Sequence, residues 1–135
     1  MSDKPVPDSA GGENALSATL WLLAHGSQMS HLSTFIYQRA DILKRYRLAA
    51  PVAIARPLHL PADVHMQPVE LDQLEAEVIA GNVLAVIFLI DPTLQTPAKP
   101  DLAALSRLCS AYDVPFAFNL ATAHPVVNSF MQTRV

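Results

Sequence analysis

VLAVIFLIDP, residues 83–92, contains the longest apolar run of the chain, eight residues that are followed by Asp91 and Pro92. A strand that is apolar on both faces is typical of a parallel sheet covered by helices on its two sides. The run is far shorter than the roughly 20 residues that a helix needs to cross a bilayer. We therefore predict that residues 83–90 form the central strand of a parallel sheet, and we expect no membrane association.

Strands and helices are predicted to alternate on both sides of this run. Apolar residues recur at three- and four-residue spacing in the predicted helices, and short apolar runs end at turn-forming residues in the predicted strands. The strands are expected at residues 16–24, 52–55, 83–90 and 115–120, and the helices at residues 29–47, 69–80, 100–112 and 122–130. This alternation predicts an α/β fold, in three layers α/β/α, with a mainly parallel central sheet.

Local patterns add detail to these elements. Ser27 or Ser30 is expected to cap the helix at 29–47, and Thr122 is expected to cap the last helix. The segment between residues 57 and 68 is rich in proline and is interpreted as an irregular loop. The helix at 69–80 is predicted to present to solvent the carboxylates of Glu70, Glu75 and Glu77.

Composition limits the domain count and the classes of partner. The chain has 135 residues, which is enough for one domain at 16–135, and residues 1–15 are interpreted as a disordered tail. Charged residues make up only 16%, below the roughly 25% of an average protein, which predicts a homo-oligomer with a covered surface. The net charge of −3 argues against nucleic acid as a partner.

Compartment and cofactor are indicated by what the sequence lacks. The single cysteine, Cys109, excludes an internal disulfide, and the acidic start has no signal-peptide pattern, so a cytoplasmic protein is expected. His59 and His65 have no clear third metal ligand nearby in the sequence, and no nucleotide-binding or zinc-protease motif occurs. We expect neither a metal nor another cofactor.

Polar residues follow each predicted strand, and parallel strands deliver such residues to one edge of the sheet. Arginine and the N–H groups at helix starts both attract a small anion. The predicted ligand-binding residues are therefore Ser27, Arg56, Asp91, Asn119 and Thr122, with His25 and Asp101 nearby. Turn or capping roles explain these side chains equally well, apart from Arg56, a charged residue at the end of an apolar run.

Residues 72–129 resemble the methylglyoxal synthase family. The likeness rests on the triplet at Ile90–Pro92, on Pro100-Asp101 before a helix, and on the motif Asn119-Leu-Ala-Thr-Ala123. The first strand and turn, LWLLAHGSQM at residues 20–29, are similar as well. The resemblance implies a carbon–oxygen lyase that forms methylglyoxal from dihydroxyacetone phosphate, generally as a homohexamer. It also implies a second use, because the same domain is an effector-binding regulatory module in carbamoyl phosphate synthetase.

The sequence departs from the family at positions that carry the reaction. His25 and Asp101 match catalytic positions of the family. Gly26 replaces an aspartate, Met29 a phosphate-contacting lysine and Ala98 a histidine, and the phosphate loop near residues 55–58 is missing. Leu71 aligns with the catalytic aspartate, and Asp72 lies one position away. The chain is therefore interpreted as a shortened, divergent member.

Three hypotheses follow. The first is a catalytically weak or inactive module that binds a small phosphorylated metabolite or inorganic phosphate and has a regulatory role. The second is an active synthase in which Asp72, Asp101 and His25 are catalytic. The third is a self-assembling interaction protein with a vestigial pocket, which docks a protein partner.

Overall fold

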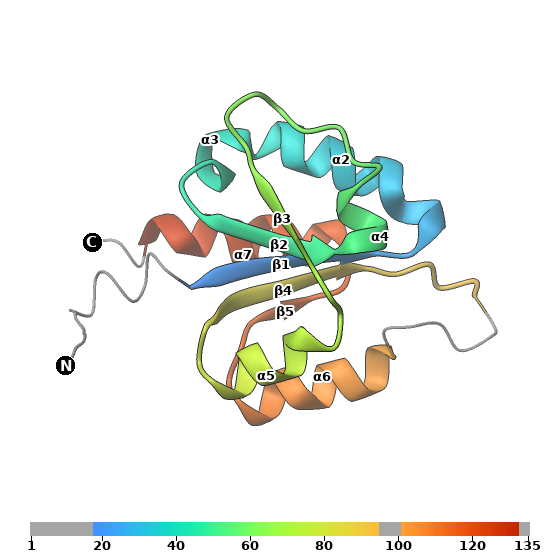
Figure 1. Cartoon of the computed structure of the whole chain (residues 1–135), viewed down its shortest axis with the longest axis vertical. Coiled ribbons are helices and arrows are strands. Elements are labelled where there is room, and N and C mark those ends of the chain that lie inside the picture. Colours follow the sequence, from blue (N-terminus) through green and yellow to red (C-terminus); the bar gives the residue numbers. More distant parts are fainter. Residues whose placement is uncertain (1–17, 95–100, 133–135) are drawn as a thin grey trace.

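The computed structural model of the chain describes residues 18–94 and 101–132 (Figure 1). The predicted tail at residues 1–15 lies outside these ranges, as do Ala98 and Pro100. Within the described part, five parallel strands form one sheet in the order β3-β2-β1-β4-β5. They are β1 (Thr19–Ala24), β2 (Arg47–Pro51), β3 (Met66–Val69), β4 (Val83–Leu89) and β5 (Phe116–Ala117).

Helices cover both faces of this sheet, which confirms the predicted three-layer α/β/α fold. Figure 1 shows α5 and α6 below the sheet, and α2, α3 and α7 on the opposite side. The helices are η2 (Gly26–Gln28), α2 (Met29–Gln38), α3 (Ala40–Leu43), α4 (Val52–Ala55), α5 (Gln73–Ile79), α6 (Leu102–Ala111) and α7 (Leu120–Gln132). None of the helices in the described ranges is long and apolar enough to span a membrane.

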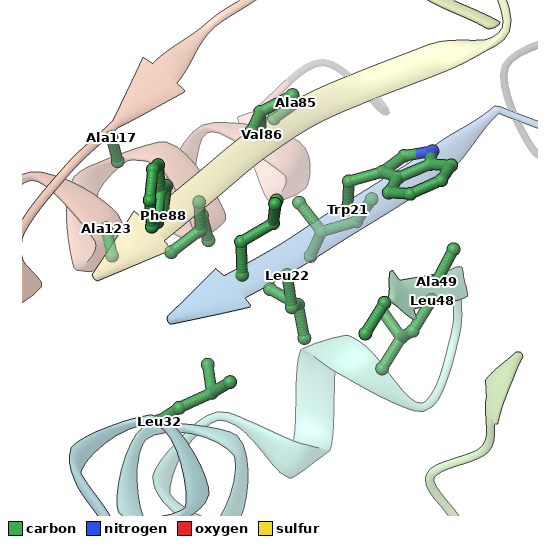
Figure 2. Close-up of a cluster of buried hydrophobic side chains, with 14 of the residues drawn as sticks. Trp21, Leu22, Leu32, Leu48, Ala49, Ala85, Val86, Phe88, Ala117 and Ala123 are labelled. Carbon is green, nitrogen blue, oxygen red and sulfur yellow. The ribbon is translucent and has the colours of Figure 1, made fainter. Parts of the chain in front are cut away.

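The predicted central run forms β4, an interior strand. It pairs with β5 on one side and with β1, the middle strand, on the other. Val86, Ile87 and Phe88 have no exposed surface, so the strand is buried on both faces as its apolar sequence requires. Figure 2 shows part of this core, with side chains of the strands gathered beside Leu32 of α2 and Ala123 of α7.

The second predicted strand is wrong. Residues 52–55 form the short helix α4, and the strand precedes them at Arg47–Pro51, inside the predicted helix at 29–47. A short apolar run fits a buried strand or a buried helix equally well, because its periodicity is too brief to distinguish them. The pairing of β2 with both β1 and β3 decides the outcome, and the preceding helix therefore ends at Leu43.

Three further local expectations are corrected by the structure. The loop predicted at 57–68 contains most of β3, and the helix predicted to begin at residue 69 begins at Gln73. Glu70 consequently lies between a strand and a helix instead of on a helix face. Neither Ser27 nor Ser30 caps α2, whose N-cap residue, Gln28, makes no side-chain capping bond.

Substitution of a buried isoleucine and of an exposed isoleucine should have very different effects on the free energy of unfolding. Ile87→Ala in β4 removes a fully buried side chain, so we expect a loss of about 2–5 kcal/mol in the free energy of unfolding. Ile79→Ala is the matched control, because Ile79 of α5 is 51% exposed, and its effect should stay within about 0.5 kcal/mol. Urea unfolding measures both. Equal losses in the two variants would contradict this description of the core.

Candidate ligand site at the carboxyl edge of the sheet

The order of the strands places a topological switch point between β1 and β4. The chain passes from β1 to β2 on one side and from β4 to β5 on the other, so the connections diverge at the carboxyl ends of β1 and β4. Ligands of open parallel sheets bind at such a switch point. The register aligns Ala24 with Leu89, so the two strands end together. His25, the next residue after β1, and Asp91, the second residue after β4, therefore meet at this edge.

Hydrogen bonds join the two strand ends directly. The backbone N–H of His25 donates to the carbonyl oxygen of Leu89 at 3.0 Å, and the backbone N–H of Asp91 donates to Nδ1 of His25 at 2.7 Å. Ser27 Oγ donates to Asp91 Oδ2 at 2.6 Å. Thr93 donates to Asp91 Oδ1 through its backbone N–H at 2.9 Å and its hydroxyl at 2.6 Å. We call His25, Ser27, Asp91 and Thr93 the switch-point clasp.

The clasp determines which nitrogen of His25 is available to a ligand. Nδ1 accepts a hydrogen bond from a backbone N–H, so in the neutral ring the proton is on Nε2. The ring also packs edge-on against Phe88, with ring centroids 5.0 Å apart and an interplanar angle of 78°. The half-buried imidazole is thereby held from two sides, and its Nε2–H remains as a hydrogen-bond donor.

The Asp91 carboxyl group is charged at neutral pH. The hydrogen bond from the Ser27 hydroxyl is the largest cause of a pKa lowered from 3.8 to about 2, followed by the two bonds from Thr93. Both carboxylate oxygens have donors within the clasp. Asp91 therefore orders the loop after β4, which agrees with the structural interpretation of this residue, and its charge does not favour an anion beside it.

A pocket of about 920 Å³ opens at this edge, and we call it the His25 pocket. Its chemically distinctive lining residues are His25, Arg56 and Glu70. The remaining lining residues are small or apolar: Ala24, Gly26, Met29, Pro51, Val52, Ala53, Ile54, Pro57, Leu71 and Leu94. Among the described residues, neither the Arg56 nor the Glu70 side chain has a hydrogen-bond or ion-pair partner. The lining thus includes one basic residue, one acidic residue and one histidine.

The predicted residues Asn119 and Thr122 lie elsewhere. Asn119 Oδ1 accepts hydrogen bonds from the backbone N–H of Thr122 at 2.9 Å and from its hydroxyl at 2.8 Å. Asn119 therefore caps α7, in the role predicted for Thr122. Asn119 lines a separate pocket of about 170 Å³ with Gln28 and His31. These two residues do not join the His25 pocket.

The predicted catalytic aspartates are also separate from His25. Asp72 and Asp101 line a third pocket, of about 270 Å³, between α5 and α6. Asp101 caps α6 by accepting a hydrogen bond from the backbone N–H of Ala103 at 3.0 Å. The set of Asp72, Asp101 and His25 is therefore divided between two pockets, and the structure does not bring it together.

Glu70 is the pocket residue that the sequence interpretation missed. It follows β3 directly, at the same edge to which β1 and β4 deliver His25 and Asp91. Recognising residues 66–69 as a strand would have placed Glu70 there. For metal binding, the described ranges contain no group of three or more His, Cys, Asp or Glu side chains arranged to hold an ion.

Known proteins share this sequence pattern and architecture, although no family model matches the chain. An uncharacterized protein of Synechocystis is 36% identical over 125 residues, covering 88% of this chain, but the chain spans only 29% of that protein. The methylglyoxal synthase of Borrelia garinii is 33% identical over 115 residues, covering 81% of this chain and 91% of that protein. The enzyme of that name from Thermus thermophilus is 33% identical over 120 residues, with coverages of 80% and 90%.

A solved structure has the same fold. The crystal structure of methylglyoxal synthase from Elizabethkingia anophelis superposes with a TM-score of 0.74 at 25% identity, covering 82% of this chain and 76% of that one. Sheet order and pocket position define a three-layer α/β/α domain with its pocket at the switch point. Within that class, the chain belongs to the methylglyoxal synthase family.

The clasp predicts how acid affects this site. Ser27→Ala removes the strongest donor to Asp91, so we expect the pKa of the Asp91 carboxyl to rise from about 2 toward 3.8. Because the folded-state pKa is depressed, the stabilisation is complete above the ordinary pKa of 3.8 and is lost as the pH falls toward 2. The stability difference between the wild type and Ser27→Ala should therefore shrink over this interval.

Carboxyl-detected NMR titration measures the pKa, and urea unfolding at several pH values measures the stability difference. Ser30→Ala is the matched control, because Ser30 is an exposed serine of α2 outside the clasp. An Asp91 pKa that is the same in Ser27→Ala and in the wild type would contradict the assignment of Ser27 as its main donor.

Proposed function

We propose that the chain binds a small phosphorylated metabolite in the His25 pocket and acts as a binding or regulatory module with little synthase activity. The observation that carries this proposal is that Arg56 and the His25 imidazole line one pocket at the switch point. A guanidinium forms charge-assisted, bidentate hydrogen bonds with phosphate oxygens, and the Nε2–H of His25 adds a neutral donor. The volume of about 920 Å³ is within the range of small-molecule sites.

The residues that line the pocket support the proposal that synthase activity is low. Formation of methylglyoxal from dihydroxyacetone phosphate needs a carboxylate base beside a carbon-bound proton and donors for the departing phosphate. Leu71 occupies the aligned position of the base, and Met29 replaces the lysine; both line the His25 pocket as apolar side chains. Asp72 and Asp101 line a different pocket, which argues against the synthase built on them.

Self-association and a cytoplasmic location stay predictions. The low charge of the chain and the exposed aromatic side chains of Tyr112 and Phe118 support a homo-oligomer or a protein partner. The interaction-protein hypothesis with a vestigial pocket applies if the pocket binds no ligand.

Calorimetry tests ligand binding. We expect inorganic phosphate and triose phosphates to bind with dissociation constants below millimolar, and Arg56→Ala to weaken binding by about ten-fold or more through loss of a charge-assisted bond. Arg47→Ala is the matched control, because Arg47 is an exposed arginine at the amino end of β2, opposite the pocket edge. Equal affinities of Arg56→Ala and the wild type would overturn the proposed site.

A coupled assay tests catalysis. We expect turnover of dihydroxyacetone phosphate at least about 100-fold below 1 per second, the slow end of ordinary enzyme rates. Asp72→Asn and Asp101→Asn should leave any residual rate unchanged, since neither residue lines the His25 pocket. Turnover near 1 per second that either substitution abolishes would restore the active synthase.

A further inference from the structure

Glu70 lines the His25 pocket, and no side chain in the described part of the chain pairs with its carboxylate. It lies between β3 and α5, it is an exposed residue, and it belongs to the lining of the pocket that Arg56 also lines. Two opposite charges that share a pocket usually form an ion pair, yet the described residues include no ion pair between these two. Within residues 18–94 and 101–132, both side chains are therefore without a charged partner that would compete with a ligand.

The charge balance of the pocket disfavours a simple anion. Arg56 contributes one positive charge and Glu70 one negative charge, and the other lining residues apart from His25 carry none. The nearby Asp91 carboxylate, ionised in the clasp, adds further negative charge at this edge. A phosphate group is attracted by the guanidinium of Arg56 and repelled by the carboxylate of Glu70. A simple phosphate dianion therefore makes a favourable contact with only one of the two charged residues.

A ligand that has an anionic group at one end and a hydrogen-bond donor at the other can contact both Arg56 and Glu70. A carboxylate has only acceptor oxygens, so its complement is a hydroxyl or an ammonium group. The pocket volume leaves room for such a group beside a phosphate.

We propose that Glu70 is the specificity-determining residue of this pocket, and that it selects anionic ligands which carry a hydrogen-bond donor at their other end. This inference rests on the proposed function, since it assumes that Arg56 holds the anionic group. It assigns to Glu70 the recognition of the donor group, while Asp72 and Asp101 line the neighbouring pocket between α5 and α6.

A series of three phosphate monoesters with one skeleton tests the proposal. Ethyl phosphate has no donor on its chain, 2-hydroxyethyl phosphate has a hydroxyl, and 2-aminoethyl phosphate has an ammonium group. By calorimetry, we expect the wild type to bind at least one donor-bearing ester about five-fold or more tighter than ethyl phosphate, as befits a hydrogen bond to a charged group at a solvated site. The tighter of the two identifies the preferred donor.

Glu70→Gln removes the charge and keeps the shape of the side chain. We expect it to reduce the preference to about two-fold or less and to tighten ethyl phosphate binding, because repulsion is relieved. Glu75→Gln is the matched control, since Glu75 lines the pocket between α5 and α6, and the preference should be unchanged in this variant.

The outcomes separate the two proposals. If all three esters bind through Arg56 with equal affinity, or with a preference that survives Glu70→Gln, the role of Glu70 is wrong and the proposed binding function stands. If none of the esters binds to the wild type, both are wrong.

Discussion

The hydrogen bond from the Asp91 backbone to Nδ1 of His25 is the contact on which the site depends. It continues the pairing of β1 with β4 beyond Ala24 and Leu89, at the point where the chain connections diverge. Because β1 is the middle strand and β4 is buried on both faces, the core holds the two strand ends in place. Ser27 and Thr93 then fix the Asp91 carboxylate, and the imidazole is left with one oriented donor.

The same constraint separates structural polar residues from those available to a ligand. Asp91, Asn119 and Asp101 use their side chains to order a loop or to cap a helix. Arg56 and Glu70 have no such partner among the described residues, and both line the His25 pocket. Membership of the methylglyoxal synthase family fits the fold, and the apolar residues Met29 and Leu71 belong to the lining of this pocket.

The sequence predicts the parts of the structure that depend on strong local patterns. Residues 83–90 are apolar on both faces, so their burial as an interior strand is predictable, and His25 and Asp91 follow strands closely enough to be placed at one edge. Residues 52–55 are too few to show a period, and only pairing with β1 and β3 identifies 47–51 as the strand. Because residues 57–68 are predicted to be a loop, the strand β3 is missed, and Glu70 is not placed at the edge of the sheet. Asp72, two positions further along and directly before α5, lines the pocket between α5 and α6.

A crystal structure of the full chain with 2-hydroxyethyl phosphate tests the central claim most directly. The claim is that His25, oriented by the switch-point clasp, and Arg56 together form the anion site. The account predicts phosphate oxygens within hydrogen-bond distance of the Arg56 guanidinium and of His25 Nε2, with the Asp91 N–H still bonded to Nδ1. A phosphate seated in the Asp72–Asp101 pocket or beside Asn119, with the His25 pocket empty, would contradict it.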